Sequence, residues 1–364
     1  MSEEVRYRLY GKGDESEIVE LLTGVFGKWP QIDVDCSPIE YWRWKYLGNP
    51  RRDNLNVVAE CDDKIVGCYH VIPLNIKIRE SVHFCFTNVD LAVHPEYRQR
   101  GIMVGLREYK NRQALSLGAR AGYHITGNPI LLRRNLRVNK LFPFRIANLV
   151  RIRDIDLHLE KMPVREGTVK KAGFLALKTL NRLNSALRIH GDEQGSFETR
   201  EINGFDERYD RLWERLAPNY DFIIDRTGEY MNWRYSDPRI GGYTVRIAED
   251  DSGELVGYCV SRVNSFREDY PIGYIVDLQV VPGKTKALER LIAETLVGYD
   301  EAGVNIVLCQ LIKNHRHSST LKKLGFLDSR VNFHMSYSHL GDHDVFSEIE
   351  NADPSRVCIS WGGS

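Results

Sequence analysis

The stretch from residue 88 to residue 106 combines residue types that can bind an anion. Apolar and polar residues alternate from Asn88 to Val93, which predicts a strand with one buried face. Pro95 ends this strand because proline has no N–H to donate to a sheet. The turn Arg98–Gly101 then leads into a segment with helical spacing of its apolar residues. Such a turn leaves backbone N–H groups at the helix start unpaired and directed at one point, so we predict an anion site that suits a pyrophosphate.

The motif Arg98-x-x-Gly101-x-Met103, directly after Val93-His94-Pro95-Glu96-Tyr97, resembles the acyl-CoA signature of the GNAT N-acyltransferases. The usual family form is Arg/Gln-x-x-Gly-x-Gly/Ala after a strand that ends in Val-x-Pro. Met103 departs from this form, but the backbone N–H at that position makes the contact. The resemblance implies transfer of an acetyl or other acyl group from acetyl-CoA to a primary amine, by direct attack and without a metal.

The same resemblance implies which residues hold the acyl donor. The pantetheine arm is expected to lie like an added strand between residues 88–93 and the next strand, Ala121–Thr126. A backbone N–H near Val93 is expected to stabilise the oxyanion that forms during transfer. Asn128 matches an asparagine on the turn into the last helix of the family, and a plain helix N-cap is the alternative. The expected donor-binding residues are Leu91, Ala92, Val93, Arg98, Gln99, Arg100, Gly101, Ile102, Met103, Val104 and Asn128.

Catalytic groups are harder to assign. An attacking amine must lose a proton, so a general base is useful. Many relatives have a carboxylate on the motif strand, where this chain has Val89, or a tyrosine in the last helix, where this chain has none. The candidates on the two strands are Asp90, Tyr123 and His124. Asp90 recurs in the second half of the chain, which favours a structural role, and a bound water is an equal alternative as the proton relay.

The sequence repeats itself. Trp44-Lys45-Tyr46 recurs as Trp233-Arg234-Tyr235, and Asp90-Leu91-x-Val93-x-Pro95 recurs as Asp277-Leu278-x-Val280-x-Pro282, in the same order and at nearly the same separation. We therefore expect an α/β (α+β) fold with a mixed sheet and two GNAT acyl-CoA N-acyltransferase domains in tandem. The expected ranges are an N-terminal domain at 1–160, a helical linker at 161–196, a degenerate C-terminal domain at 197–340 and a tail at 341–364.

The second copy lacks the anion motif. Pro282 is followed by Gly283-Lys284-Thr285 with no Arg-x-x-Gly, and the upstream glycine of a phosphate loop is missing. Our hypothesis is that this copy has lost donor binding and shapes the acceptor pocket. Trp42 has no aromatic counterpart in the second copy and is predicted to line an acceptor cleft. The apolar stripe at Ala176, Leu180, Leu183 and Leu187 favours a connecting helix over a helix on a membrane surface.

Local patterns predict further elements in the first copy. These are strands at 5–10, 56–61, 65–71 and 75–79, helices at 15–26 and 37–46, a hairpin turn at 61–64, and a last short helix that reaches Leu141.

Composition narrows the classes of function. Lys+Arg and Asp+Glu both number 50, which argues against a nucleic-acid or membrane partner. The seven cysteines form no Cys-x-x-Cys pair or zinc pattern and are expected to be free thiols. No apolar segment of membrane-spanning length occurs, so we expect a cytoplasmic protein. The expected acceptor is a small-molecule or peptide amine. A non-catalytic acyl-CoA-binding regulatory protein and an aminoacyl-transferase of the peptidoglycan-bridge type are the alternatives.

Overall fold

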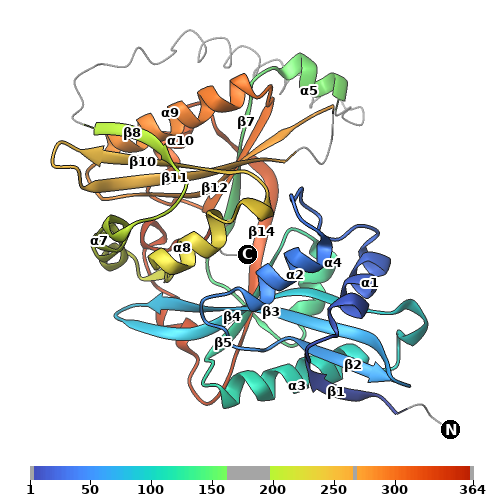
Figure 1. The fold of residues 1–364 in the computed structure, drawn as a ribbon. Coiled ribbons are helices and arrows are strands. Elements are labelled where there is room, and N and C mark those ends of the chain that lie inside the picture. The colour runs from blue at the N-terminus through green and yellow to red at the C-terminus, as the bar shows by residue number, and fades with distance from the viewer. Residues whose placement is uncertain (1–3, 162–196, 265–268, 361–364) are drawn as a thin grey trace.

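The computed structural model describes residues 4–161, 197–264 and 269–360. These residues form a fourteen-stranded mixed sheet with helices packed against it, arranged as two lobes (Figure 1). The predicted α/β fold with a mixed sheet is confirmed.

The first half of the chain supplies most of one lobe. Its elements are β1 (Arg6–Leu9), α1 (Glu15–Phe26), α2 (Pro38–Leu47), β2 (Val57–Cys61), β3 (Lys64–Ile78), β4 (Ser81–Val93), α3 (Ile102–Ser116), β5 (Ala121–Thr126), α4 (Pro129–Asn135), β6 (Lys140–Leu141), β7 (Ile146–Ile152) and α5 (Ile155–Lys161).

The second half begins with β8 and continues to the C-terminal tail. Its elements are β8 (Phe197–Ile202), α7 (Glu207–Leu216), β9 (Phe222–Ile224), α8 (Gly228–Tyr235), β10 (Tyr243–Asp250), β11 (Leu255–Asn264), β12 (Ile272–Val280), α9 (Thr285–Glu301), β13 (Ile306–Ile312), α10 (Ser318–Lys323) and β14 (Leu327–His339). Short 3₁₀ turns lie at Pro95–Tyr97, Ala217–Asn219, Pro238–Ile240, Val345–Ile349 and Pro354–Arg356.

The two halves of the sequence exchange strands. The sheet order is β1-β2-β3-β4-β5-β14-β7-β13-β12-β11-β10-β8. The C-terminal part of β14 pairs with β5, and β7 lies between β13 and β14. Figure 1 shows β14 running from one lobe into the other. The part of the sheet built by the first half thus contains β14 and also β9, which pairs with β3, and the part built by the second half contains β7. The domain ranges themselves stay a prediction.

Local sequence explains the elements that carry the site. Ser37 accepts from the backbone N–H of Glu40 and Glu40 bonds back to Ser37, a capping box that starts α2 as predicted. Asp62 and Asp63 both have positive φ, 50° and 57°, which is the requirement of the tight turn predicted between β2 and β3.

Two local predictions were wrong. Residues 75–79 do not form a separate strand, because β3 runs without a break to Ile78 and forms a long hairpin with β4, which begins at Ser81. The last short helix ends at Asn135 and does not reach Leu141. Lys140 and Leu141 instead pair with β14, the strand that comes from the far end of the chain.

The helices of the first half cover opposite faces of its sheet. Helices α1 and α2 pack on one face with Cys68, Ile72 and Ala92, while α3 packs on the other with Val66 and Leu91. The predicted linker helix, with its stripe at residues 176–187, lies outside the described residues.

The tail after β14 packs on the protein. Phe346 and Ile349 are fully buried in a core shared by both halves, and Cys358 N–H donates to the Phe222 carbonyl. All seven cysteines are free thiols, as predicted. In the described residues, no helix is both long enough and apolar enough to cross a bilayer.

Candidate functional site

The parallel strands β4 and β5 pair over a short stretch and then separate. Their last paired residues are Thr87 and Tyr123, so the end of β4 has no strand partner on this side. His94 N–H donates to Val66 in β3 at 2.9 Å. Because peptide groups alternate along a strand, the N–H and carbonyl of Val93 face the gap between β4 and β5. The gap lies where the sequence analysis expected the two strands to part.

The entrance of α3 presents unpaired N–H groups beside this gap. Gly101 caps the helix with a φ of 78°, and an added Cβ there would meet no atom within 4 Å. Among the described residues, no acceptor is assigned to the backbone N–H of Gly101, Ile102 or Met103. The Met103 side chain is exposed and leaves these groups accessible. This open set of donors at a helix start fits a diphosphate.

The remaining expected donor-binding residues lie around the same turn. Arg98, Gln99, Arg100 and Val104 are exposed, and Leu91 and Val93 are half-buried on β4. Asn128 lies apart from them as the N-cap of α4, where its side chain accepts from Ile130 and Leu131 at 2.9 and 3.2 Å. The cap interpretation therefore describes Asn128 in this structure.

Asp90 is the extra residue of a β-bulge in β4. The register with β3 shifts between Tyr69 and His70, and Asp90 has a φ of 44°. Trp42 Nε1 donates to His70 Nε2 at 3.2 Å, which leaves His70 Nδ1 to donate to the Asp90 carbonyl at 3.3 Å. Burial lowers the pKa of His70 to about 4, so this imidazole is neutral near pH 7. The prediction that Trp42 lines a cleft was wrong, because its indole is fully buried in this chain of hydrogen bonds.

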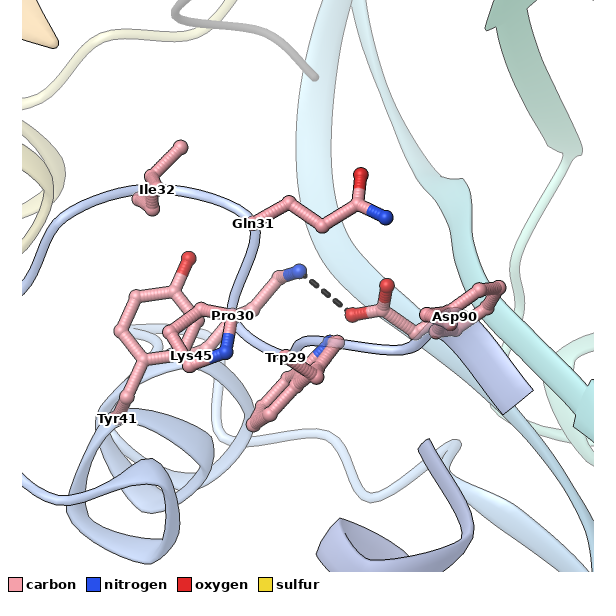
Figure 2. A pocket seen from close by; sticks show the side chains of 8 residues that line it. Trp29, Pro30, Gln31, Ile32, Tyr41, Lys45 and Asp90 are labelled. Atoms are coloured by element: carbon pink, nitrogen blue, oxygen red, sulfur yellow. Dashed lines mark hydrogen bonds and ion pairs between the residues drawn. The ribbon is translucent and has the colours of Figure 1, made fainter. Parts of the chain in front are cut away.

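The Asp90 carboxylate lies at a cavity of about 250 Å³. Its Oδ2 accepts from Lys45 Nζ at 2.7 Å (Figure 2). The same oxygen also accepts from the hydroxyl of Tyr46. Burial alone raises the pKa of Asp90, but the Lys45 charge and both hydrogen bonds outweigh it and hold the pKa below its ordinary value. The cavity is lined by Phe26, Trp29, Pro30, Gln31, Ile32, Tyr41, Lys45 and Asp90.

Hydrogen bonds from the second half of the chain fix the position of a first-half loop that forms one wall of this cavity. This loop, residues 27–37, connects α1 and α2 and carries Trp29 to Ile32. Asp35 N–H donates to the Arg239 carbonyl at 2.9 Å, and the Arg262 guanidinium donates to the Asp33 carbonyl. The shape of the cavity thus depends on both halves.

The other two catalytic candidates have different surroundings. The Tyr123 side chain is buried and bonded to Thr87, and burial raises its pKa far above the ordinary value. Tyr123 is the last paired residue of β5 and so lies at the narrow end of the gap, and its raised pKa keeps the hydroxyl protonated near pH 7. His124 is half-buried with its Nδ1 3.2 Å from Asn135 Nδ2 of α4, and burial lowers its pKa.

Sequence reasoning missed Lys45, Tyr46 and His70 as partners of Asp90. The repeat contained a signal for one of them, since Tyr46 and its partner Asp90 recur together as Tyr235 and Asp277. His70 lies twenty residues from Asp90 on a neighbouring strand, and only the register of the hairpin places it there.

The equivalent region of the second half is closed. Asp277 is 1% exposed and paired with the buried Arg226 at 2.7 Å. Gln279 accepts from Tyr220 at 2.6 Å and donates to the Cys358 thiol at 3.0 Å, so the C-terminal tail covers this region. The first half therefore has an accessible carboxylate where the second half has a sealed one.

Comparison with protein families gives a match in the N-terminal part of the chain. Residues 6–123 match the family described as an acetyltransferase (GNAT) domain. No curated protein sequence matches the chain. The match runs from β1 to the first half of β5 and includes β4 with Asp90 and the start of α3.

Solved structures with a similar fold cover nearly the whole chain. Saccharomyces cerevisiae N-myristoyltransferase with bound myristoyl-CoA has 13% identity and a TM-score of 0.63 over 93% of this chain and 83% of that chain. A GCN5-related N-acetyltransferase from Anabaena variabilis has 11% identity and a TM-score of 0.62 over 93% and 73% of the two chains. An Enterococcus faecalis protein described as a probable N-acyltransferase has 11% identity and a TM-score of 0.61 over 93% and 72%. At these identities the likeness concerns the fold.

Proposed function

We propose that this chain is an acyltransferase that moves an acyl group, in the simplest case acetyl from acetyl-CoA, to an amine acceptor. The observation that carries the proposal is the separation of β4 from β5 after Thr87 and Tyr123, directly beside the unpaired N–H groups at Gly101. A diphosphate at those groups and an extended arm along the end of β4 together describe an acyl-CoA.

Residues of the first half bind and orient the donor in this proposal. The backbone groups of Leu91 and Val93 bond the extended arm, Ala92 lies between them with its own peptide groups toward β3, and residues 98–104 bind the diphosphate. The N–H of Val93 faces the gap and can donate to the oxygen that gains negative charge. Asn128 lies on the turn after β5, and its role toward the donor stays a prediction.

The acceptor amine enters through the cavity at Asp90 in this proposal. Aromatic walls from Trp29 and Tyr41 and the nearby carboxylate suit an amine, which attacks directly from the face opposite α3. Asp90 accepts a proton from the amine, directly or through water, while Lys45 and Tyr46 orient it. Tyr123, at the narrow end of the gap, and His124 are the candidate acids for the departing thiolate, and the raised pKa of Tyr123 makes it the weaker donor in the free protein.

The second half has a supporting role in this proposal. It anchors the loop at residues 27–37 through Arg239 and Arg262, and so fixes one wall of the acceptor cavity. The closed surroundings of Asp277 are consistent with a copy that no longer binds a donor. We place the protein in the cytoplasm, where acetyl-CoA and reduced cysteines occur together.

One observation favours a second candidate, a non-catalytic acyl-CoA-binding regulatory protein. Oδ2 of Asp90 already accepts two hydrogen bonds, which makes this carboxylate a weaker base.

Thiol release from acetyl-CoA over a panel of polyamines, amino sugars and peptides, with Asp90→Asn as control, separates the two functions. Turnover that depends on Asp90 supports the enzyme. Saturable binding without turnover on any acceptor supports the regulatory protein, and no binding of acetyl-CoA refutes both.

A further inference from the structure

The narrow end of the gap between β4 and β5 is closed by a polar bridge of two buried side chains. Asn88 Nδ2 donates to the Tyr123 carbonyl of β5 at 3.0 Å, at the first position of β4 beyond the paired residues. Lys110 on α3 donates from Nζ to Asn88 Oδ1 at 2.6 Å. The Asn88–Lys110 bridge thus joins β4, β5 and α3 where the gap ends.

The bridge lies in an otherwise apolar setting. Lys110 is 2% exposed, and its Nζ lies 4.4 Å from the ring centre of Phe86 and 4.7 Å from that of Tyr69. Burial, together with the charge of Arg107, lowers the pKa of Lys110 to about 7. An apolar chain that displaced the bridge would leave a buried amine and a buried amide without hydrogen bonds, which is costly.

We propose that the Asn88–Lys110 bridge selects short acyl chains, with acetyl as the simplest, against long ones such as octanoyl. This inference rests on the proposed function, because it assumes that the acyl donor lies in the gap. With the extended arm along Leu91 to Val93, the acyl group lies toward the narrow end, where the bridge blocks further extension. The relative solved with myristoyl-CoA shows that this fold can hold a long chain, so the limit is set by local side chains.

Two variants open the narrow end in different ways. Asn88→Ala removes the side chain that crosses the gap, and Lys110→Met replaces the buried amine by a thioether of similar length. Arg112→Met is the matched control, because it removes one positive charge from the same helix at a position outside the bridge. If Asn88→Ala does not fold, Lys110→Met carries the test alone.

The measurement is the dissociation constant of CoA, acetyl-CoA and octanoyl-CoA by calorimetry for each protein. We expect wild type and Arg112→Met to bind octanoyl-CoA at least about tenfold more weakly than acetyl-CoA. In Asn88→Ala and Lys110→Met this ratio should fall about tenfold, while CoA itself binds within about twofold of wild type.

The outcomes test the role of the bridge separately from the proposed function. If wild type binds octanoyl-CoA as tightly as acetyl-CoA, or if both variants keep the wild-type ratio, the bridge does not select chain length and the proposed function still stands. If none of the three ligands binds to wild type, the proposed function and this inference are both refuted.

Discussion

Replacing Gly101 with aspartate tests whether the start of α3 binds the diphosphate of an acyl-CoA. Gly101 has a φ of 78° and open space where a Cβ would lie, so the cost to the free protein is backbone strain of about 1–2 kcal/mol without a clash. Gly283→Asp is a matched control, because Gly283 has a φ of 86°, equally open space and a place just before α9. With an unfolding entropy of about 2.1 cal/mol/K per residue, either change lowers the melting temperature by roughly 1–3 °C.

The ligand separates the two variants. Acetyl-CoA at about 100 times its dissociation constant stabilises a binding protein by about 2.7 kcal/mol, which raises the melting temperature of a chain of this length by roughly 3–4 °C. We expect this shift in wild type, Gly283→Asp and Lys284→Ala. Gly101→Asp should lose it, because a carboxylate then lies among the N–H groups that bind the diphosphate.

Differential scanning fluorimetry with and without acetyl-CoA measures both effects. A shift that persists in Gly101→Asp, or one that disappears in Gly283→Asp, would refute the assignment of the donor to the first half.

Four further predictions concern side chains at the site and between the halves. Asp90→Asn should leave acetyl-CoA affinity unchanged and lower kcat about a hundredfold or more, and an unchanged kcat would exclude Asp90 as the base. Because the pKa of Asp90 is lowered in the folded state, its pairing with Lys45 stabilises the fold at neutral pH, and this stabilisation is lost as the pH falls below about 4. In urea unfolding, the free energy of unfolding of Asp90→Asn should therefore decline less toward acid pH than that of wild type. Lys110 has a folded pKa of about 7, so the unfolded chain binds more protons between pH 7 and about 10, and wild-type stability should rise there by roughly 1.4 kcal/mol per pH unit. Urea unfolding of Lys110→Met should lack this rise, and equal slopes would show that Lys110 is charged in the fold. The rings of Trp44 and Trp233 stack with their centres 5.3 Å apart, and each indole N–H donates to the other residue's carbonyl. Trp233→Phe should therefore lower the free energy of unfolding by about 1–2 kcal/mol in urea and leave the affinity for acetyl-CoA unchanged. A weaker affinity would link this contact to the site.

The elements that present backbone groups at the candidate site could be predicted from the sequence. The alternation at residues 88–93, the stop at Pro95 and the turn to Gly101 predicted a strand, a loop and a helix start, and the structure has all three. These features are local, so short-range patterns determine them. The start of the helix at residues 37–46 could be predicted for the same reason.

The parts that sequence reasoning missed depend on distant pairing. The bulge that turns Asp90 toward Lys45 and Tyr46 follows from a one-residue register shift against β3, which no pattern within β4 reveals. Trp42 was placed in a cleft because it lacks a repeat partner, yet its hydrogen bond to His70 buries it. Lys140 and Leu141 looked helical in isolation and pair with β14 instead.

The exchange of β7 and β14 between the two halves of the sheet limits which parts of the chain can be deleted. A fragment ending at residue 160 would expose the edge of β5 that β14 now covers, and an exposed strand edge promotes aggregation. Its own β7 would at the same time lose β13, the neighbour from the other lobe. Because each half of the sheet is completed by a strand from the other half of the sequence, neither half can be removed without leaving an unpaired strand edge in the other.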